Sequence, residues 1–265
     1  MDVTCNVEDG IAQVRLNRPD KLNSLTLPLL RELTQTAHGL AKDKNVRAVV
    51  IGGEGRTFCA GLDFASVMSD RKGVLKTFAP RPWRKGGTND FQEAVWALRS
   101  IPAPVIAAVH GHCLGGGVQI ALGADFRYAT PDSTWSVLEG KWGIIPDMTG
   151  IQSLSEVVGI DVAKRLTMTS EMFSGDRAHQ LGLVTEISED PVAAATGFAQ
   201  ELLQRSPDAL AAAKRLFDDT WHATPRRTFR RERREQVALL RSENAKIARV
   251  AGLKKEAPVF QPRER

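Results

Sequence analysis

The chain has 265 residues, of which 42% are hydrophobic and 25% are charged, as in soluble globular proteins, and this composition excludes a disordered or fibrous chain. At this length roughly 70% of the surface of the unfolded chain can be buried, so a core needs no disulfide or metal. The three cysteines are scattered, no apolar run approaches the roughly 18 residues of a membrane span, and the N-terminus does not resemble a secretory signal. We therefore expect a cytoplasmic protein.

Basic residues outnumber acidic ones by 36 to 31, which favours an anionic partner such as a coenzyme, a nucleotide or nucleic acid. Much of the surplus lies in one run, from Arg226 to Arg234. Phe229 is the only aromatic residue in this run, and Glu232 and Glu235 offset part of its positive charge, whereas a nucleic-acid site would interleave more aromatic residues. We interpret the run as a solvated or subunit-packed helix face, with nucleic-acid binding as the less favoured alternative.

The first third of the chain predicts a strand, a helix and a second strand. Apolar and polar residues alternate over 11–16, which is typical of a half-buried strand. Thr26 and Pro28 then stand in the usual order for the cap and first turn of a helix. The apolar positions of this helix fall on one face: Leu29, Leu30, Leu33, Ala37 and Leu40. Residues 47–52 form a continuous apolar run that predicts a strand buried on both faces, and 58–63 a short element and turn.

Periodicity fails between Met68 and Thr88, which predicts a mobile surface loop that could serve as a substrate lid. It resumes as a helix over 91–99 and a buried strand over 102–109. From Val192 onward the chain is predicted to be helical throughout, with one long helix from about 225 to 251. Strands that alternate with helices up to about residue 187 indicate an α/β protein with a parallel-rich sheet. We therefore divide the chain into an α/β core, 1–190, and a helical region, 191–265.

Three successive glycines, 115–117, follow the strand and precede a helix. Glycines there let backbone N–H groups face a ligand, and the helix N-terminus adds a positive dipole end. Ile120 occupies the place of the third glycine of a GxGxxG dinucleotide motif, and no GxxxxGK[ST] or GxSxG motif occurs. The pattern leaves two interpretations, a glycine-lined oxyanion site and a tight strand-to-helix turn.

The cysteines and histidines near this stretch do not predict chemistry. Cys59 and Cys113 have no base placed in the sequence to activate them, so we interpret them as small core residues. His110 and His112 lack the acidic or cysteine partner that would complete a metal site. We therefore expect no metal.

Five segments, in a fixed order along the chain, carry motifs of a known family. The segments are Asn17–Leu25, Phe58–Asp63, Gly111–Asp125, Leu138–Pro146 and Ala178–Val184. With them the chain resembles the crotonase (enoyl-CoA hydratase/isomerase) superfamily along nearly its whole length. The resemblance implies a ββα spiral core with a C-terminal α-helical trimerisation region, assembled as a homotrimer or a hexamer.

The resemblance also implies that the backbone N–H groups of Leu62 and Gly116 form an oxyanion hole. These donors would hold the thioester carbonyl of an acyl-CoA and stabilise the enolate formed when a proton leaves or joins the acyl chain. One such donor can contribute roughly 3 kcal/mol to stabilising the transition state. Because the donors are backbone groups, a change to the side chain of Leu62 should matter less than a change to Gly116.

The chain departs from the family's hydratases at one of two acidic positions. Hydratases resembling it carry a glutamate at the position of Gln119 and another twenty residues later, at Glu139. A neutral amide can bind water but cannot take its proton, so one of the two acid–base groups is missing. Isomerases of the family work with a single glutamate at the position of Glu139. The resemblance therefore favours double-bond migration, with Glu139 as the acid/base.

A further carboxylate, Asp147, follows eight residues after Glu139. The dienoyl-CoA isomerases of the family have an aspartate at this offset, which shuttles protons together with the glutamate. That branch also has an aspartate at the position of Gln119, so the match covers two of its three acids. The alternative is that Asp147 caps a helix beginning near Thr149.

Coenzyme A would enter as part of the substrate, and we expect no separate cofactor. The resemblance implies contacts of Lys21 and Leu22 with the pantetheine and nucleotide, and of Ala60, Gly61 and Asp63 with the adenine side. Lys255 lies where family members offer a C-terminal lysine to the CoA phosphate, often from a neighbouring subunit; the alternative is a solvated tail.

The leading hypothesis is an enzyme that shifts the double bond of an enoyl- or dienoyl-CoA. One alternative is a weak enoyl-CoA hydratase in which Gln119 merely positions water. Others are a non-catalytic acyl-CoA binder and an RNA-binding relative that uses the Arg226–Arg234 run.

Overall fold

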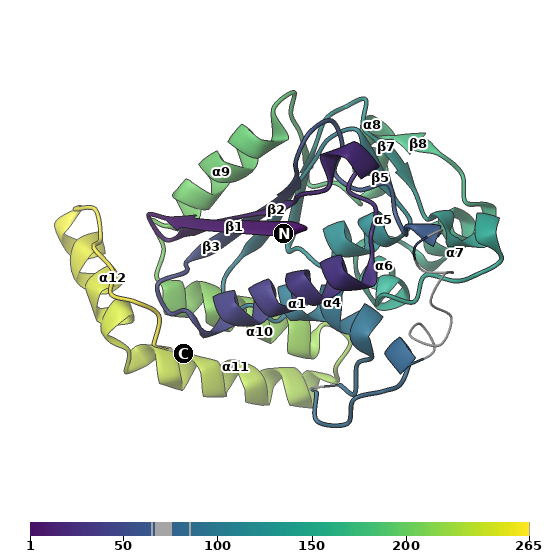
Figure 1. Ribbon diagram of the computed structural model, residues 1–265. Helices are drawn as coiled ribbons and strands as arrows, with labels where there is room; N and C mark the ends of the chain where they lie inside the picture. The colour runs from purple at the N-terminus through teal and green to yellow at the C-terminus, as the bar shows by residue number, and fades with distance from the viewer. Residues whose placement is uncertain (65, 67–75, 85, 265) are drawn as a thin grey trace.

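The computed structural model describes residues 1–64, 66, 76–84 and 86–264 (Figure 1). A 6-stranded sheet in the order β1-β2-β3-β4-β6-β9 forms the centre, with β1 antiparallel to β2 and the other neighbours parallel. Its strands are β1 (Val3–Glu8), β2 (Ile11–Leu16), β3 (Ala48–Gly53), β4 (Val105–Val109), β6 (Phe126–Ala129) and β9 (Glu186–Ile187). A separate 3-stranded sheet contains β5 (His112–Leu114), β7 (Thr134–Ser136) and β8 (Phe173–Ser174). The predicted parallel-rich sheet is confirmed.

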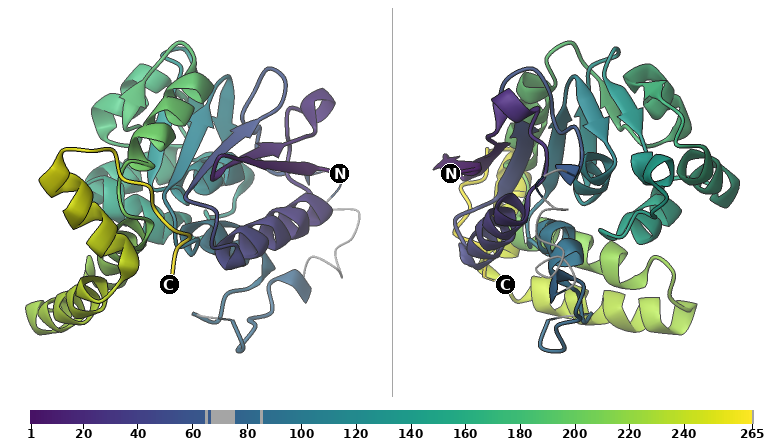
Figure 2. Two further views of the ribbon diagram at one scale, coloured as in Figure 1. Left: turned by 90° about the vertical axis from the view of Figure 1, so that its left-hand side faces the viewer. Right: turned by 45° about the vertical axis from the view of Figure 1, so that its right-hand side comes forward.

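Helices cover both faces of the main sheet, as the unbroken apolar run of β3 predicted. Val49 and Ile51 belong to the core cluster shared with α1 (Leu27–Lys42) and α4 (Asp90–Arg99). Ala48 and Val50, on the other face, pack with α9 (Pro191–Leu202). Figure 2 shows α1 and α9 on opposite sides of the sheet. α9, which the sequence analysis assigned to the helical region, thus packs directly on the sheet.

The predicted elements of the first half agree with the structure. β2 lies over the predicted range, and all six residues of β3 are buried. α1 is capped by Thr26, whose hydroxyl accepts a hydrogen bond from the Leu29 N–H at 3.2 Å. Its five buried residues are those expected from the periodicity: Leu29, Leu30, Leu33, Ala37 and Leu40.

The remaining helical segments lie between strands of the two sheets or follow α9. They are η1 (Pro19–Lys21), α5 (Gly116–Leu122), η2 (Leu138–Trp142), α6 (Gly150–Val157), α7 (Ile160–Thr169), α8 (Gly175–Leu181), α10 (Pro207–Thr220), α11 (Pro225–Leu240) and α12 (Glu243–Lys254).

The expectation of one long helix from 225 to 251 is wrong. The chain ends α11 at Leu240 and begins α12 at Glu243, because the Ser242 hydroxyl accepts a hydrogen bond from the Ala245 N–H at 3.2 Å and caps a new helix. Residues 256–264 are not helical either, so the region after Val192 is not helical throughout.

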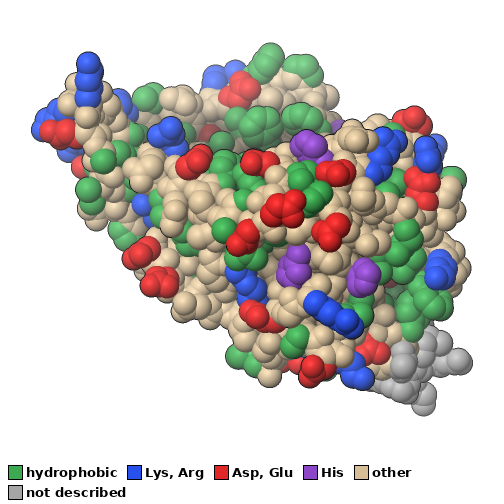
Figure 3. Space-filling view, turned by 90° about the horizontal axis from the view of Figure 1, so that it is seen from above, with side chains coloured by type: hydrophobic (Ala, Val, Ile, Leu, Met, Phe, Trp, Pro, Cys, Tyr) green, Lys and Arg blue, Asp and Glu red, His purple; other side chains and the backbone are tan. Residues whose placement is uncertain are grey.

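Of the loop predicted between Met68 and Thr88, residues 68–75 and 85 lie outside the described residues, and its suggested role as a lid stays a prediction. The described part, 76–84 and 86–88, consists of turns and irregular structure apart from two helical residues, 76 and 77. In the described part of the chain, no helix combines the length and apolarity that crossing a bilayer requires. Acidic and basic side chains are intermingled on the face seen from above, so the basic surplus is not gathered there (Figure 3).

Candidate active site

A cavity of about 620 Å³ lies between the start of α5, η2 and the loop that follows β3. It is lined by all five residues predicted to act on the substrate: Leu62, Gly116, Gln119, Glu139 and Asp147. Ala60 and Gly61 line it as well. Residues as far apart in the sequence as Ala60 and Asp147 therefore meet at one cavity.

The first predicted oxyanion donor, Leu62, is held by an isolated parallel bridge to Leu25. The Leu25 N–H donates to the Gly61 carbonyl at 2.8 Å, and the Asp63 N–H donates to the Leu25 carbonyl at 2.9 Å. In this parallel pairing the hydrogen bonds to Leu25 are made by the residues on either side of Leu62, so the N–H of Leu62 itself points away from Leu25. The Leu62 N–H donates to no residue that the structure describes.

Glycines bring the second predicted donor, Gly116, close to the same loop. Gly61 has a φ of +91°, and a Cβ atom on it would come within 2.9 Å of the Leu114 carbonyl oxygen. The loop therefore lies against the turn that precedes Gly116. A Cβ on Gly116 would lie 2.7 Å from Leu25 Cδ1, so a side chain at this position requires a buried neighbour to move. As the first residue of α5, Gly116 also has no acceptor for its N–H within the helix.

Gln119 is 2% exposed, and its side chain joins three parts of the site. Its Oε1 accepts hydrogen bonds from the Met148 N–H at 2.7 Å and the Gly150 N–H at 3.0 Å. Its Nε2 donates to Glu139 Oε1 at 2.6 Å. Because two backbone donors occupy the carbonyl oxygen, that oxygen has no lone pair left for water. The amide instead fixes the position of one oxygen of Glu139.

Glu139, in η2, is 6% exposed and faces the cavity. Its Oε2 is buried and has no hydrogen-bond partner among the described residues. Burial raises the pKa of Glu139, and the nearby charge of Asp147 raises it further, against the lowering effect of its backbone and Gln119 hydrogen bonds. A carboxyl group with a raised pKa and one unpartnered oxygen can both accept and return a proton.

Asp147 is partly buried on the same cavity, and burial raises its pKa too. The alternative that it caps a helix is not supported by the hydrogen bonds of α6. The Gly150 N–H, at the start of α6, donates to Gln119 Oε1, and Thr149 at the N-cap makes no capping hydrogen bond. Asp147 is thus available to the cavity as a second titratable group.

The rest of the lining is apolar and was not predicted from the sequence. The rings of Phe64 and Trp142 lie 4.7 Å apart, and the ring of Phe78 lies 5.0 Å from that of another lining residue, Phe91. Ile144 and Ile145 are exposed by 46% and 69%. An available signal was the apolar cluster that follows Glu139 directly in the sequence.

The residues predicted to contact CoA lie in different places. Lys21 and Leu22 form a turn beside the cavity wall, because the Leu22 carbonyl accepts a hydrogen bond from the Ala60 N–H at 3.0 Å. Asp63 lies outside the cavity lining, and its carboxylate pairs with Arg18 at 3.4 Å.

Lys255 lies far from the cavity of its own chain. It is exposed at the C-terminal cap of α12, with a φ of 58°. Figure 1 shows α12 at the opposite end of the molecule from α6 and α7. The structure therefore does not bring Lys255 together with the residues that line the cavity.

Cys59 and Cys113 lie behind the wall of the cavity as buried partners in a second isolated bridge. Burial raises the pKa of Cys59 to about 12 and that of Cys113 well above its ordinary value. Neither thiol is poised as a nucleophile, which agrees with their interpretation as core residues.

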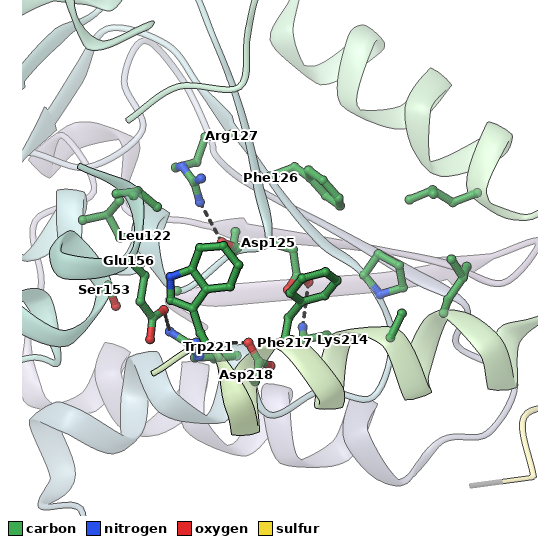
Figure 4. A pocket seen from close by; sticks show the side chains of 18 residues that line it. Leu122, Asp125, Phe126, Arg127, Ser153, Glu156, Lys214, Phe217, Asp218 and Trp221 are labelled. Atoms are coloured by element: carbon green, nitrogen blue, oxygen red, sulfur yellow. Dashed lines mark hydrogen bonds and ion pairs between the residues drawn. The ribbon is translucent and has the colours of Figure 1, made fainter. Parts of the chain in front are cut away.

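A second cavity, of about 450 Å³, lies between α10 and the turn from α5 to β6 (Figure 4). Its three acidic side chains are all ion-paired: Asp125 with Lys214 at 2.7 Å, Asp218 with Arg99 at 3.0 Å, and Glu156 also with Arg99. It therefore offers no unpaired carboxylate to a substrate, in contrast to the cavity of Glu139.

The comparison with known proteins assigns the chain to a family. The model of the protein family Enoyl-CoA hydratase/isomerase matches residues 6–263 of this chain. This chain belongs to the enoyl-CoA hydratase/isomerase family, whose members act on acyl-CoA substrates.

The names of individual relatives include both dienoyl-CoA isomerases and enoyl-CoA hydratases. The mitochondrial Delta(3,5)-Delta(2,4)-dienoyl-CoA isomerase of Mus musculus is 32% identical over 215 residues, which make up 79% of this chain and 66% of that protein. The chain thus spans just under two thirds of that relative. The mitochondrial enoyl-CoA hydratase domain-containing protein 2 of Homo sapiens is 33% identical over 218 residues, 80% of this chain and 72% of that protein.

Solved structures confirm the crotonase fold. An enoyl-CoA hydratase from Polaromonas sp. JS666 superposes with a TM-score of 0.88 at 28% identity and covers 98% of this chain and 99% of its own. The enoyl-CoA hydratase from Mycobacterium tuberculosis H37Rv gives a TM-score of 0.86 at 27% identity, with 98% of each chain covered.

Proposed function

We propose that this enzyme moves the double bond of an enoyl- or dienoyl-CoA, with Glu139 as the acid/base. One observation carries the proposal: Gln119 uses its carbonyl oxygen on two backbone N–H groups and its amide N–H on Glu139. The cavity therefore has a single carboxylate at the pair of positions where a hydratase of this family uses two. Isomerisation needs no second base, because it adds no water.

The proton balance of the reaction fits one carboxylate. Glu139 takes a proton from a carbon of the acyl chain, and the electron pair left behind passes into the thioester as an enolate. The N–H groups of Leu62 and Gly116 hold the enolate oxygen, each contributing about 3 kcal/mol or more. Glu139 then returns the same proton to a different carbon, and the double bond ends at a new position.

A dienoyl-CoA would spread the transfer over a longer conjugated system, and Asp147 would serve as the second proton-carrying group. The raised pKa values of both Glu139 and Asp147 support this division of labour. So does the name of the mouse relative.

Recognition of the CoA portion follows from the same proposal. Lys21, Leu22, Ala60, Gly61 and Asp63 contact the nucleotide and pantetheine. Lys255 reaches the CoA phosphate of a neighbouring copy in a homotrimer or hexamer, in line with its distance from its own cavity (Figure 1).

The second candidate is weak hydration of an enoyl-CoA. Gln119 Nε2 carries two hydrogens and donates one to Glu139, so the other can donate to a water molecule. The hydratase names of several relatives favour this candidate.

Parallel assays separate the two reactions. We would measure hydration of crotonyl-CoA and isomerisation of 3-enoyl- and 3,5-dienoyl-CoA for the unmodified enzyme, Glu139→Gln and Glu189→Gln. Glu189 is an exposed glutamate outside the cavity and serves as the matched control. Isomerisation should fall by about 10²- to 10⁴-fold in Glu139→Gln alone. Vigorous hydration that survives Glu139→Gln would overturn the proposal.

A further inference from the structure

The basic run that the proposed reaction leaves unused forms one face of α11. Arg227, Arg230, Arg231 and Arg234 are spaced by three, four and seven residues, which places them on the same side of the helix. Together with Asp219 and Thr220 at the end of α10, they line a hollow of about 410 Å³. α10 and α11 lie side by side along the lower edge of the molecule (Figure 1).

A buried acid fixes the orientation of this arginine face. Glu235 is 4% exposed and pairs with Arg215 of α10 at 2.9 Å and with Arg231 of α11 at 3.3 Å. Arg231 also pairs with Asp219 of α10 at 2.7 Å. These contacts tie α11 to α10, so the arginines on either side of Arg231 are held at the rim of the hollow.

The three flanking arginines have no such partners. Arg227, Arg230 and Arg234 form no ion pair or side-chain hydrogen bond with any residue that the structure describes. Asp219 is the single acid among the residues that line the hollow, and it is engaged by Arg231. The hollow is therefore strongly positive, which favours binding of an anion.

We propose that this hollow binds a small molecule that carries two or more linked phosphoryl groups. Guanidinium groups bind phosphate oxygens through paired hydrogen bonds. Arg227 and Arg234 are seven residues apart, which is about 10 Å along the helix axis. A single phosphate would use only part of the donors that four guanidinium groups offer along such a row, whereas a diphosphate can use more of them.

Two kinds of molecule carry such linked phosphoryl groups: a free nucleoside polyphosphate and a CoA ester, through its diphosphate. A long nucleic acid fits less well, because the hollow is bounded by α10 and the run holds one aromatic residue, Phe229, for base stacking. The inference does not depend on the proposed isomerisation.

The test compares two double variants of the full-length protein that remove equal charge from α11. Arg227→Gln/Arg234→Gln removes two arginines that line the hollow. Arg226→Gln/Arg233→Gln removes two exposed arginines with the same spacing, neither of which lines it. Calorimetric titrations would use inorganic pyrophosphate, ADP, CoA and a single-stranded RNA, each at two salt concentrations.

We expect pyrophosphate to bind the unmodified protein and the Arg226/Arg233 variant alike, and the Arg227/Arg234 variant at least about tenfold more weakly. A rise in the KM for enoyl-CoA in the Arg227/Arg234 variant would assign the diphosphate to the substrate. An unchanged KM with lost ADP binding would assign it to a free nucleotide.

Absence of pyrophosphate binding, or an equal loss in both variants, would overturn the inference. So would tight binding of a single-stranded RNA that both variants weaken to the same degree, because that result would identify a diffuse nucleic-acid surface instead of the hollow. Circular dichroism of both variants confirms that the helix is intact.

Discussion

Gln119 Nε2 lies 2.6 Å from Glu139 Oε1, and through this hydrogen bond the buried carboxylate is joined to the start of α6. A neutral side chain thus stands where a second acid would repel Glu139. The hydrogen bond from Gln119 therefore fixes the position of the Glu139 carboxylate, and Gln119 does not compete with Glu139 for a proton.

Replacing Gln119 by leucine should both destabilise the protein and shift its pH profile. The N–H groups of Met148 and Gly150 would lose their acceptor, at a cost of about 1–3 kcal/mol for each buried donor. The hydrogen bond that lowers the pKa of Glu139 would also disappear, so this pKa should rise further. Denaturant unfolding and the acidic limb of the kcat/KM profile measure the two effects. An unchanged acidic limb would show that Gln119 does not position the acid/base.

Replacing Gln119 by glutamate should introduce hydration. One carboxylate oxygen can keep the hydrogen bonds from Met148 and Gly150, and the other adds the missing acid–base group beside Glu139. The two carboxylates would share a proton, as close pairs do. We expect crotonyl-CoA hydration to rise at least about tenfold over the unmodified enzyme. If the variant folds correctly but gains no hydration activity, the missing carboxylate at position 119 is not what limits hydration.

Glu139→Gln should make the protein more stable at neutral pH while lowering isomerisation by about 10²- to 10⁴-fold. The pKa of Glu139 is raised in the folded state, so its contribution to stability is present below the unfolded pKa of about 4.3 and is lost as the pH rises through the folded pKa. Glutamine does not ionise and still accepts the hydrogen bond from Gln119. The melting temperatures of the two proteins should converge near pH 4 and separate toward pH 7, with the variant higher; a separation of the opposite sign would refute the assigned shift.

Gly116→Ala and Leu62→Ala should differ sharply in activity. A Cβ at Gly116 would lie 2.7 Å from Leu25 Cδ1 and 3.2 Å from Met148 Sδ. Both side chains are buried, so we expect a shift of the start of α5, and of its N–H, to relieve part of the crowding. Loss of one oxyanion donor lowers kcat by about 10²- to 10³-fold. Leu62→Ala leaves the backbone donor in place and should cost less than about tenfold. Steady-state kinetics measure the loss of kcat in each variant. Equal losses in the two variants would argue against a backbone role for Leu62.

Asp147→Asn should separate dienoyl from enoyl substrates. If Asp147 carries the second proton, the variant should lose about 10²-fold in 3,5-dienoyl-CoA isomerisation and little in 3-enoyl-CoA isomerisation. A parallel assay of both substrates measures the ratio. If the variant isomerises the dienoyl substrate as fast as the unmodified enzyme does, Asp147 does not carry the second proton.

The sequence predicts the central part of this fold because its signals are local. The alternation in β2, the apolar run of β3 and the capped amphipathic pattern of α1 each depend on neighbours within one element. The strands β5 and β8 are three and two residues long, and periodicity cannot reveal elements of that length. The division of 225–251 into two helices depended on one hydroxyl, that of Ser242, within an otherwise continuous helical pattern.

The candidate site was predictable only through the family resemblance, which assigned Leu62, Gly116 and Glu139 to one cavity. Nothing in local sequence relates Gln119 to Met148 and Gly150, because those hydrogen bonds join residues 29 and 31 positions apart. The apolar lining was missed for a similar reason. Phe64 and Trp142 come into contact only after the chain has folded.

The burial of Cys59 and Cys113 leaves Cys5 as the one thiol that a reagent in solution can reach. Partial burial raises the pKa of Cys5, so its labelling should speed up under mildly alkaline conditions. A fluorophore can therefore be attached to β1 of the unaltered sequence, with no engineered cysteine. Such a label would report on chain association through energy transfer between copies.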